Sequence, residues 1–426
     1  MKFLFLTQYF TPEASAAPIR LAAIIRQLRR LGHDVEVVTA MPNYPVGRIF
    51  AAYRGKFYVR EIWEGVRVHR VWLYAAVGKG WRRYLNYFTF TLMSFFGIFK
   101  AGKADCLFVE SPPLSLSVTG FFYSRLRNVP FVFYVADLWP DAIRDNLELN
   151  KEGVALKFAR ALERWSYRKA DYVCAVTEGI LSELQRRKVP QSKLLFLPNG
   201  VDLDQFAPMP PDDSLRHQLG LQEKEIVLYA GTHGYAHGME RILGAARVLQ
   251  ERRPQCHFVF VGEGSAKPAM IRQAKELGIH NVSFLDAVPP DQVSRLFSIA
   301  FCGVVSLNES SISQHTRPVK SLTAMSCGKP VVYIGSGEGS QLVKNTNAGF
   351  VLEQGDPDAI AEAICQLAVD PRLAKSQGQN GRKFIETNLA WPLLVGRWFD
   401  DLAGRLRMSQ QQTQQQLEAV KSCTQL

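Results

Sequence analysis

Short apolar segments alternate with helical patterns along most of this chain, and that rhythm constrains the fold more than any other feature. The segments lack a polar residue at every second position, so they predict strands of parallel sheets that helices cover on both faces. In the first half they are residues 3–6, 35–38, 106–109, 131–135 and 172–176. In the second half they are residues 226–229, 258–261, 282–285, 303–305, 330–334 and 350–352. We therefore expect an α/β protein with two Rossmann-like, doubly wound units in succession.

The length of the chain agrees with two domains of similar size. Its 426 residues exceed the roughly 250 to 300 residues at which a single core stops growing. A Pro-rich segment at 198–211 separates the two series of strands, so we expect a first domain over 1–203 and a second over 204–387. The Gln-rich segment 409–426 is too poor in apolar residues to form a core, and we expect it to be disordered.

Cysteine usage and hydropathy indicate a reducing, cytoplasmic setting. None of the seven cysteines forms a C-x-x-C pair and no His stands at metal-ligand spacing, which argues against a disulfide framework and a metal site. The apolar start of the chain, residues 1–6, is too short for a signal peptide. The most apolar later stretch, 84–99, is interrupted by polar residues and falls short of the ~20 needed to cross a bilayer.

The net charge of +12 is confined to the first half. Residues 1–200 hold 29 basic and 16 acidic residues, whereas residues 201–426 hold 22 and 23. This asymmetry indicates an anionic partner for the first half, such as nucleic acid, anionic lipid or a phosphorylated acceptor; a solubility charge is the alternative. The basic and aromatic segment 81–100 is suited to lying among lipid headgroups, although a buried helix would have a similar composition.

Two glycine-rich loops directly follow the first two strands of the second half. Ligands of doubly wound sheets bind at the carboxyl ends of the strands, and glycines let backbone N–H groups approach an anion. A pair of such loops favours a nucleotide site over ordinary turns, and two histidines in the first loop, His233 and His237, favour a ligand role. The candidate residues are Gly231, Thr232, His233, Gly234, Gly262, Gly264 and Ser265.

Charged residues at two further places in the sequence are also candidate site residues. Arg317 and Lys320 open a predicted helix, where cations oppose the helix dipole; a bound diphosphate would remove that conflict, and solvated surface charges are the equal alternative. Together with the N–H groups of Thr232 and His233, these cations favour a bound diphosphate. Asp137 follows a buried strand, where it can orient an acceptor hydroxyl or simply cap a helix.

Several longer motifs resemble family 4 glycosyltransferases. In the second half they are Pro198-Asn199-Gly200-Val201-Asp202, Tyr229-Ala230-Gly231 with Gly238-Met239-Glu240, Val261-Gly262-Glu263-Gly264 and Gly328-Lys329-Pro330-Val331-Val332. In the first half, motifs similar to the WbuB-like fucosaminyltransferase branch are Tyr9-Phe10-x-Pro12-Glu13, Pro42-Asn43-Tyr44-Pro45, Gly65-Val66-Arg67-Val68-His69-Arg70, Asp137-Leu138-Trp139-Pro140 and Glu163-Arg164-Trp165. The resemblance extends from residue 1 to about residue 400.

This resemblance implies a GT-B fold in which the second domain holds a nucleotide-diphosphate sugar and the first holds the acceptor. It also implies retention of anomeric configuration, no metal or cofactor, and a helix at about 388–408 that crosses back onto the first domain. The implied catalytic residues are Lys320, Arg317, Asp137 and His233, and the donor site adds Thr323 and Glu338. The implied acceptor site comprises Glu13, Ser15, Arg20, Asn43 and Tyr44.

The sequence departs from the family pattern at three places. Where the family has a pair of carboxylates, this sequence has His315 and Thr323. Where the family often has Gly-Gly, it has Ser15-Ala16, and where the family often has an Arg before Asp-Leu-Trp-Pro, it has Ala136. The expected function is a retaining transfer of a sugar to a lipid-linked or oligosaccharide acceptor in surface polysaccharide synthesis, on the cytoplasmic face of the membrane. A nucleotide-sugar 2-epimerase and an inactive sugar-nucleotide-binding scaffold are the alternatives, whereas no recognisable module supports nucleic-acid binding.

Overall fold

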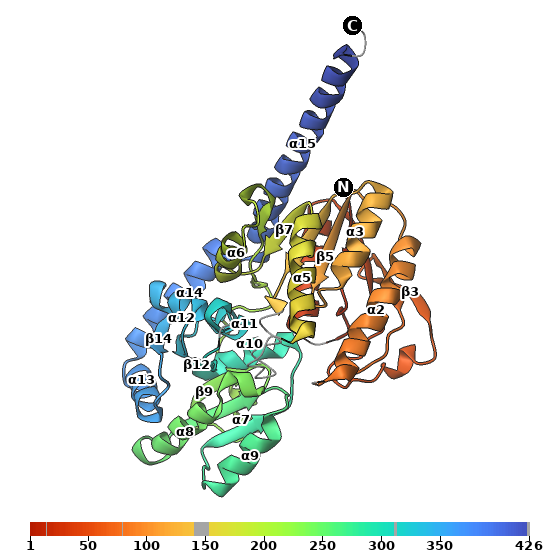
Figure 1. Ribbon diagram of the computed structural model, residues 1–426. Coiled ribbons are helices and arrows are strands. Elements are labelled where there is room, and N and C mark those ends of the chain that lie inside the picture. The colour runs from red at the N-terminus through yellow and green to blue at the C-terminus, as the bar shows by residue number, and fades with distance from the viewer. Residues whose placement is uncertain (14, 79, 140–152, 311–312, 424–426) are drawn as a thin grey trace. The chain divides into compact units, whose positions relative to one another are not determined.

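The computed structural model describes residues 1–13, 15–78, 80–139, 153–310 and 313–423 (Figure 1). The chain divides into two compact units: a first unit of Met1–Pro198 with Trp391–Leu426, and a second unit of Asn199–Ala390. These bounds differ slightly from the expected 1–203 and 204–387, because the Val201 N–H donates to the Leu389 carbonyl at 2.8 Å. That hydrogen bond ties the segment after Pro198 to the second unit.

The first unit is built on an eight-stranded sheet in the order β3-β4-β2-β1-β5-β6-β7-β8. Its strands are β1 (Lys2–Leu6), β2 (Asp34–Ala40), β3 (Tyr58–Trp63), β4 (Val66–Val71), β5 (Cys106–Ser111), β6 (Phe131–Val135), β7 (Tyr172–Ala175) and β8 (Leu194–Phe196). All neighbours are parallel except β3 and β4, which form an edge hairpin. The hairpin escaped the sequence prediction because its outer strand alternates in burial, unlike a strand covered on both faces.

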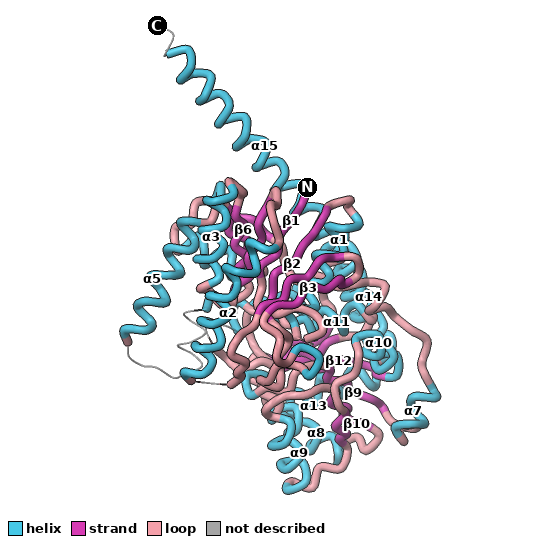
Figure 2. Tube along the Cα trace, turned by 90° about the vertical axis from the view of Figure 1, so that its right-hand side faces the viewer, coloured by secondary structure: helices cyan, strands magenta, loops and turns pink. Residues whose placement is uncertain are grey.

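Helices cover both faces of this sheet (Figure 2). They are α1 (Ala16–Arg30), α2 (Trp81–Lys100), α3 (Leu116–Arg127), α5 (Val154–Lys169), α6 (Glu178–Arg186) and α15 (Trp391–Cys423). Helices α2, α3 and α5 are neighbours on one face, and α1 and α15 pack together on the other. Trp398 anchors α15 against Phe3 and Phe108 in the core, with ring centroids 6.2 and 5.8 Å away.

The backbone of residues 409–423 continues α15, in contrast to the disorder expected for the Gln-rich segment. Gln is a good helix former, so it extends a helix that packing of the preceding residues has already nucleated. None of the helices in the described part of the chain has the length and hydropathy needed to cross a membrane.

The second unit contains a six-stranded, fully parallel sheet in the order β11-β10-β9-β12-β13-β14. Its strands are β9 (Glu225–Ala230), β10 (Cys256–Val261), β11 (Val282–Leu285), β12 (Ala300–Ser306), β13 (Val331–Ile334) and β14 (Gly349–Leu352). Its helices are α7 (Asp213–Leu219), α8 (Glu240–Arg252), α9 (Lys267–Glu276), α10 (Pro290–Ile299), α11 (Val319–Ser326), α12 (Glu338–Asn345), α13 (Pro357–Val369) and α14 (Pro371–Asn388). The predicted apolar runs of both halves fall on strands, so the expected fold class of two Rossmann-like α/β units is confirmed.

Candidate functional site

The two glycine-rich loops of the second unit are bonded to each other at the carboxyl ends of β9 and β10. The Gly231 N–H donates to the Val261 carbonyl at 2.8 Å, and the His233 N–H donates to the Glu263 carbonyl at 2.9 Å. A Cβ on Gly264 would lie 2.2 Å from the His233 carbonyl oxygen, so only glycine fits there. The His233 N–H, expected to bind a diphosphate, is therefore occupied by the neighbouring loop. The Gly262 N–H likewise donates to the Leu285 carbonyl at 3.2 Å, so the remaining candidates on these loops are Thr232, Gly234 and Ser265.

Lys320, in the first turn of α11, lies directly against the first of these loops. A Cβ on Gly231 would stand 2.5 Å from Lys320 Cε, and the Lys320 ammonium lies 5.0 Å from the centroid of the Tyr229 ring. Burial lowers the pKa of Lys320 to about 7. Within the described part of the chain, no carboxylate forms an ion pair with it. The site therefore holds a partly desolvated cation beside two glycine loops, an arrangement that suits an anion.

Arg317 and Glu338, both expected as donor ligands, are paired with each other. Glu338 Oε1 accepts from Arg317 Nη2 at 2.5 Å and from Arg317 Nε at 3.1 Å. Their side chains are only 7% and 12% exposed. The guanidinium is therefore held between the start of α11 and the start of α12 by a carboxylate, rather than extended toward a ligand.

Thr323 and His315 stand where the family has a pair of carboxylates. The Thr323 hydroxyl donates to the Val319 carbonyl of its own helix at 3.0 Å, and the residue is largely buried. His315 ends the short 3₁₀ helix η4 (Ser313–His315) that precedes α11. Thr323 follows Lys320 by three residues, so the two lie on one face of α11.

In the first unit, Glu13 joins the loops that follow β1 and β2. Its Oε1 accepts the N–H groups of Asn43 and Tyr44, each at 2.8 Å, and its Oε2 accepts the Phe10 N–H at 3.2 Å. Burial raises the pKa of Glu13, and these N–H groups oppose that rise. The carboxylate is thus used to position Asn43 and Tyr44, of which Tyr44 is half-buried at the strand edge.

Arg20 is a buried cation of α1 rather than a surface ligand. Its Nη2 donates to Glu110 Oε1 at 2.5 Å, and its guanidinium lies 5.3 Å from the centroid of the Tyr134 ring. Asp137 reaches the surface just after β6, yet desolvation by its surroundings raises its pKa to about 6, and the nearby charge of Arg20 opposes that rise. Ser15 is the N-cap residue of α1, and its side chain makes no capping hydrogen bond.

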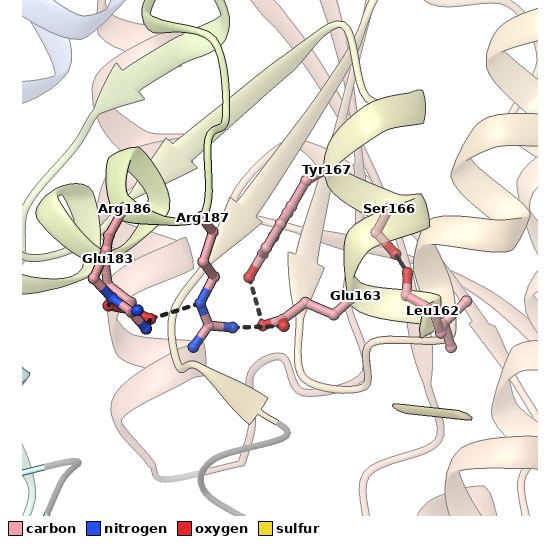
Figure 3. Close-up of polar contacts among 7 residues, drawn as sticks. All are labelled: Leu162, Glu163, Ser166, Tyr167, Glu183, Arg186 and Arg187. Carbon is pink, nitrogen blue, oxygen red and sulfur yellow. Dashed lines mark hydrogen bonds and ion pairs between the residues drawn. The ribbon is translucent and has the colours of Figure 1, made fainter. Parts of the chain in front are cut away.

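Glu163, of the Glu163-Arg164-Trp165 motif, lies on α5, and its carboxylate points toward the end of α6 (Figure 3). Glu163 accepts from the Tyr167 hydroxyl at 2.8 Å and from Arg187 Nη1 at 2.5 Å. Arg187 also donates to Glu183 Oε1 at 2.8 Å. This buried carboxylate therefore fastens two helices of the first unit to each other.

Two residues of these sites were missed in the sequence. Tyr229 was quoted as part of a strand and of a family motif but not as a site residue, yet its ring lies against Lys320. Glu110 was overlooked as the partner of Arg20. An acidic residue that ends an apolar strand, as Glu110 ends the run 106–109, is the signal that would have found it.

Two family models match the chain. A glycosyl transferase 4-like domain matches residues 17–200, and the glycosyl transferases group 1 model matches residues 212–384. Together they span β2 to β8 of the first unit and β9 to β14 of the second.

Curated relatives resemble the chain at moderate identity. WcaI of Escherichia coli K12, which carries a provisional description as a colanic acid biosynthesis glycosyl transferase, is 28% identical over 72% of this chain and 76% of its own length. The GDP-mannose-dependent alpha-(1-6)-phosphatidylinositol monomannoside mannosyltransferase of Mycolicibacterium smegmatis is 29% identical over 59% of this chain and 66% of its own length.

Solved structures share the architecture of the whole chain. Sucrose-phosphate synthase from Thermosynechococcus elongatus has a TM-score of 0.73 at 19% identity, covering 96% of this chain and 99% of its own. HepE from Anabaena in complex with UDP has a TM-score of 0.72 at 17% identity, covering 95% of this chain and 100% of its own. At such identities the likeness establishes the fold alone.

Proposed function

The chain is a glycosyltransferase of the GT-B fold, with a 4-like domain followed by a group 1 domain, and we propose that it builds a surface polysaccharide. In this proposal a sugar moves from a nucleoside diphosphate to a lipid-linked acceptor with retention of configuration. The observation that carries the proposal is the position of Lys320, a desolvated cation without a carboxylate partner in the described part of the chain, beside the two glycine loops.

The donor is a nucleotide-diphosphate sugar bound by the second unit. A diphosphate leaving group gains negative charge as the glycosidic bond breaks, so a preorganised cation stabilises the transition state. Lys320 supplies this charge, and no metal ion is proposed. The names of similar proteins support such a donor, since HepE was solved with UDP and the mycobacterial relative depends on GDP-mannose.

The acceptor meets the first unit at the carboxyl ends of β1, β2 and β6. Asp137 is exposed at this edge and is the group we propose to orient the acceptor hydroxyl. Glu13 acts there through Asn43 and Tyr44, whose backbone N–H groups it holds. The motifs around Asp137 and Asn43 also support a place near the WbuB-like fucosaminyltransferases within the family.

We also propose that the first unit docks on the cytoplasmic face of an anionic membrane, where a lipid-linked acceptor resides. Helix α2 packs on the sheet through one side, and its other side exposes large apolar residues: Trp81, Tyr84, Phe88, Leu92, Phe96 and Phe99. We call this the aromatic face. It continues onto α3, since the rings of Phe95 and Phe122 lie 6.0 Å apart and Phe122 is 48% exposed.

Cations border the aromatic face and favour anionic lipid as its occupant. Lys100 lies 5.3 Å from the centroid of the Phe96 ring, and Arg127 lies 5.7 Å from that of Phe99. Aromatic rings with cations at their edges are typical of the membrane interface, where rings enter the headgroup region and cations meet phosphates. The net charge of the first half, +13 for residues 1–200, also favours an anionic surface as its partner.

An assay with lipid extract and several sugar nucleotides tests the proposed function. We expect nucleoside diphosphate release that requires the lipid, a lipid heavier by one sugar, and a product with the donor's anomeric configuration by NMR. Isomerisation of the sugar nucleotide without any acceptor would instead identify a 2-epimerase. Nucleotide binding with neither reaction would identify a scaffold.

A further inference from the structure

Three basic side chains converge on the first glycine loop of the second unit. Lys320 lies over Gly231, His233 lies inside the loop, and His237 ends the 3₁₀ turn η3 (Tyr235–His237) that follows it. The charge of Lys320 acts on both imidazoles, so the three groups are near enough to influence one another's protonation.

Three of the four ring nitrogens of these imidazoles are buried without a hydrogen-bond partner within the described residues. Both ring nitrogens of His233, which is fully buried, and Nδ1 of His237 are without one, although the Val261 carbonyl lies near enough to His233 to favour its charged form. Buried polar nitrogens are normally satisfied, so an unfilled set beside a glycine loop indicates a ligand that completes it.

The cluster holds less charge than its composition suggests. Burial lowers the pKa of Lys320 to about 7, that of His233 to about 4 and that of His237 to about 3. Lys267 lowers the value for His233 further, and Lys320 lowers both imidazole values. At neutral pH both histidines are therefore uncharged and Lys320 is near its midpoint.

Other charged groups around the cluster are already paired. Lys267 donates to Glu263 at 2.7 Å and to Asp286 at 2.8 Å. Arg241, at the start of α8, donates to the Asn308 side chain at 2.7 Å. The pair of Arg317 and Glu338 at the start of α11 is described above. Within the described residues, no carboxylate is thus placed to hold a proton on Lys320 or His237.

We propose that the donor's diphosphate binds this cluster with uptake of a proton by the Lys320–His237 pair. The inference rests on the proposed function, because it places the donor in the second unit. A nearby anion favours the charged form of a base, so each group binds its proton more tightly in the complex than in the free protein. By linkage, affinity then falls as pH rises through the free-state pKa of Lys320, up to roughly tenfold per pH unit.

Calorimetric titration with UDP and GDP in buffers of different ionisation enthalpy measures this uptake. At pH 8 the terminal phosphate, with a pKa of about 6, is already deprotonated, so the exchanged proton belongs to the protein. Lys320 is then mostly uncharged in the free protein, and we expect uptake of up to one proton for each nucleotide bound. Binding without proton uptake would overturn the inference while leaving the proposed donor site intact.

Matched variants assign the proton to its groups. In Lys320→Arg the cation is permanent, so uptake at pH 8 should fall to near zero and the affinity should become almost independent of pH between 7 and 9. In His237→Gln, uptake at pH 6, where Lys320 is already charged, should fall below that of the parent. The exposed control Lys375→Arg should change neither quantity.

The possible failures are distinguishable. If both Lys320→Arg and His237→Gln take up as many protons as the parent, other groups carry the charge and the inference is wrong. If neither UDP nor GDP binds between pH 6 and 8, the donor site itself is wrong, and the proposed function fails together with the inference.

Discussion

Glu338 Oε1 accepts two hydrogen bonds from the guanidinium of Arg317, one from Nη2 and one from Nε. The pair links the start of α11, which carries Lys320, to the start of α12. Both side chains are largely buried. Removal of either one would therefore leave the other as a buried charge with fewer hydrogen-bond partners. The pair therefore fixes the helix that carries Lys320.

A double-mutant cycle on Arg317 and Glu338 tests this coupling. We expect Arg317→Ala and Glu338→Ala each to lower the Tm, and the double variant to lose less stability than the two losses combined. The interaction free energy should be about 1 to 3 kcal/mol, the range for hydrogen-bonded charges in contact. Calorimetric melting of the four proteins gives this value; strictly additive losses would contradict it.

Removal of the Lys320 ammonium should weaken nucleotide binding. A charge-assisted hydrogen bond to phosphate contributes roughly 1.5 to 3 kcal/mol, so Lys320→Ala should raise the Kd for UDP or GDP by about ten- to a hundredfold. Turnover should fall further, because charge on the leaving oxygen grows in the transition state. Titration at pH 6.5, where Lys320 is mostly charged, is the measurement.

The control for this prediction is Lys344→Ala, which removes an exposed lysine of α12. It should change neither affinity nor turnover. An unaltered Kd in Lys320→Ala would place the donor phosphates elsewhere on the protein.

A carboxylate at position 323 should tighten nucleotide binding. Thr323 Oγ1 is bonded to its own helix, so it leaves a ribose hydroxyl without the strong acceptor that a carboxylate provides. We expect Thr323→Glu to lower the Kd by about tenfold, equivalent to one charged hydrogen bond. Thr323→Gln, of the same length but neutral, should give a smaller gain, and equal affinities in all three proteins would contradict the ribose assignment.

Loss of apolar groups from the aromatic face should release the protein from membranes. Phe88 and Leu92 are 59% and 55% exposed on α2. Burying a large apolar side chain contributes about 1.5 to 3 kcal/mol, so the double change of both residues to Ser should lower vesicle partitioning at least about tenfold. Flotation with liposomes that contain anionic phospholipid measures this effect.

Two comparisons make the flotation assay specific. Val369→Ser, which alters an even more exposed apolar residue of the second unit, should float like the parent. Binding of the parent should weaken in high salt, because surface charges are screened. Equal recovery on neutral and anionic vesicles would remove the electrostatic part of the proposal.

The sequence predicted the parallel strands because burial on both faces leaves continuous apolar runs, as in Phe131–Val135. It also pointed to the glycine loops, since residues after parallel strands meet at one edge, and to Lys320, since a cation at the start of a helix opposes the helix dipole. It could not predict the pairing of Arg317 with Glu338 or the contact of Lys320 with Gly231. Both depend on how helices from distant parts of the chain pack, which composition and spacing do not record.

The same limit applies to Glu13. Its motif suggested an acceptor ligand, whereas the structure uses its carboxylate to hold the backbone of Asn43 and Tyr44. A residue's neighbours along the chain do not reveal that its hydrogen-bonding capacity is already taken by a loop some thirty residues away.

The hydrogen bond between the Val201 N–H and the Leu389 carbonyl joins the two ends of the second unit. This unit is thus an insertion into the first, and the chain enters and leaves it through adjacent residues. Such a unit can be exchanged as a cassette: replacement of Asn199–Ala390 by the equivalent segment of a relative preserves the distance between the flanking residues. The fold therefore permits the two units of different relatives to be recombined by a single genetic exchange.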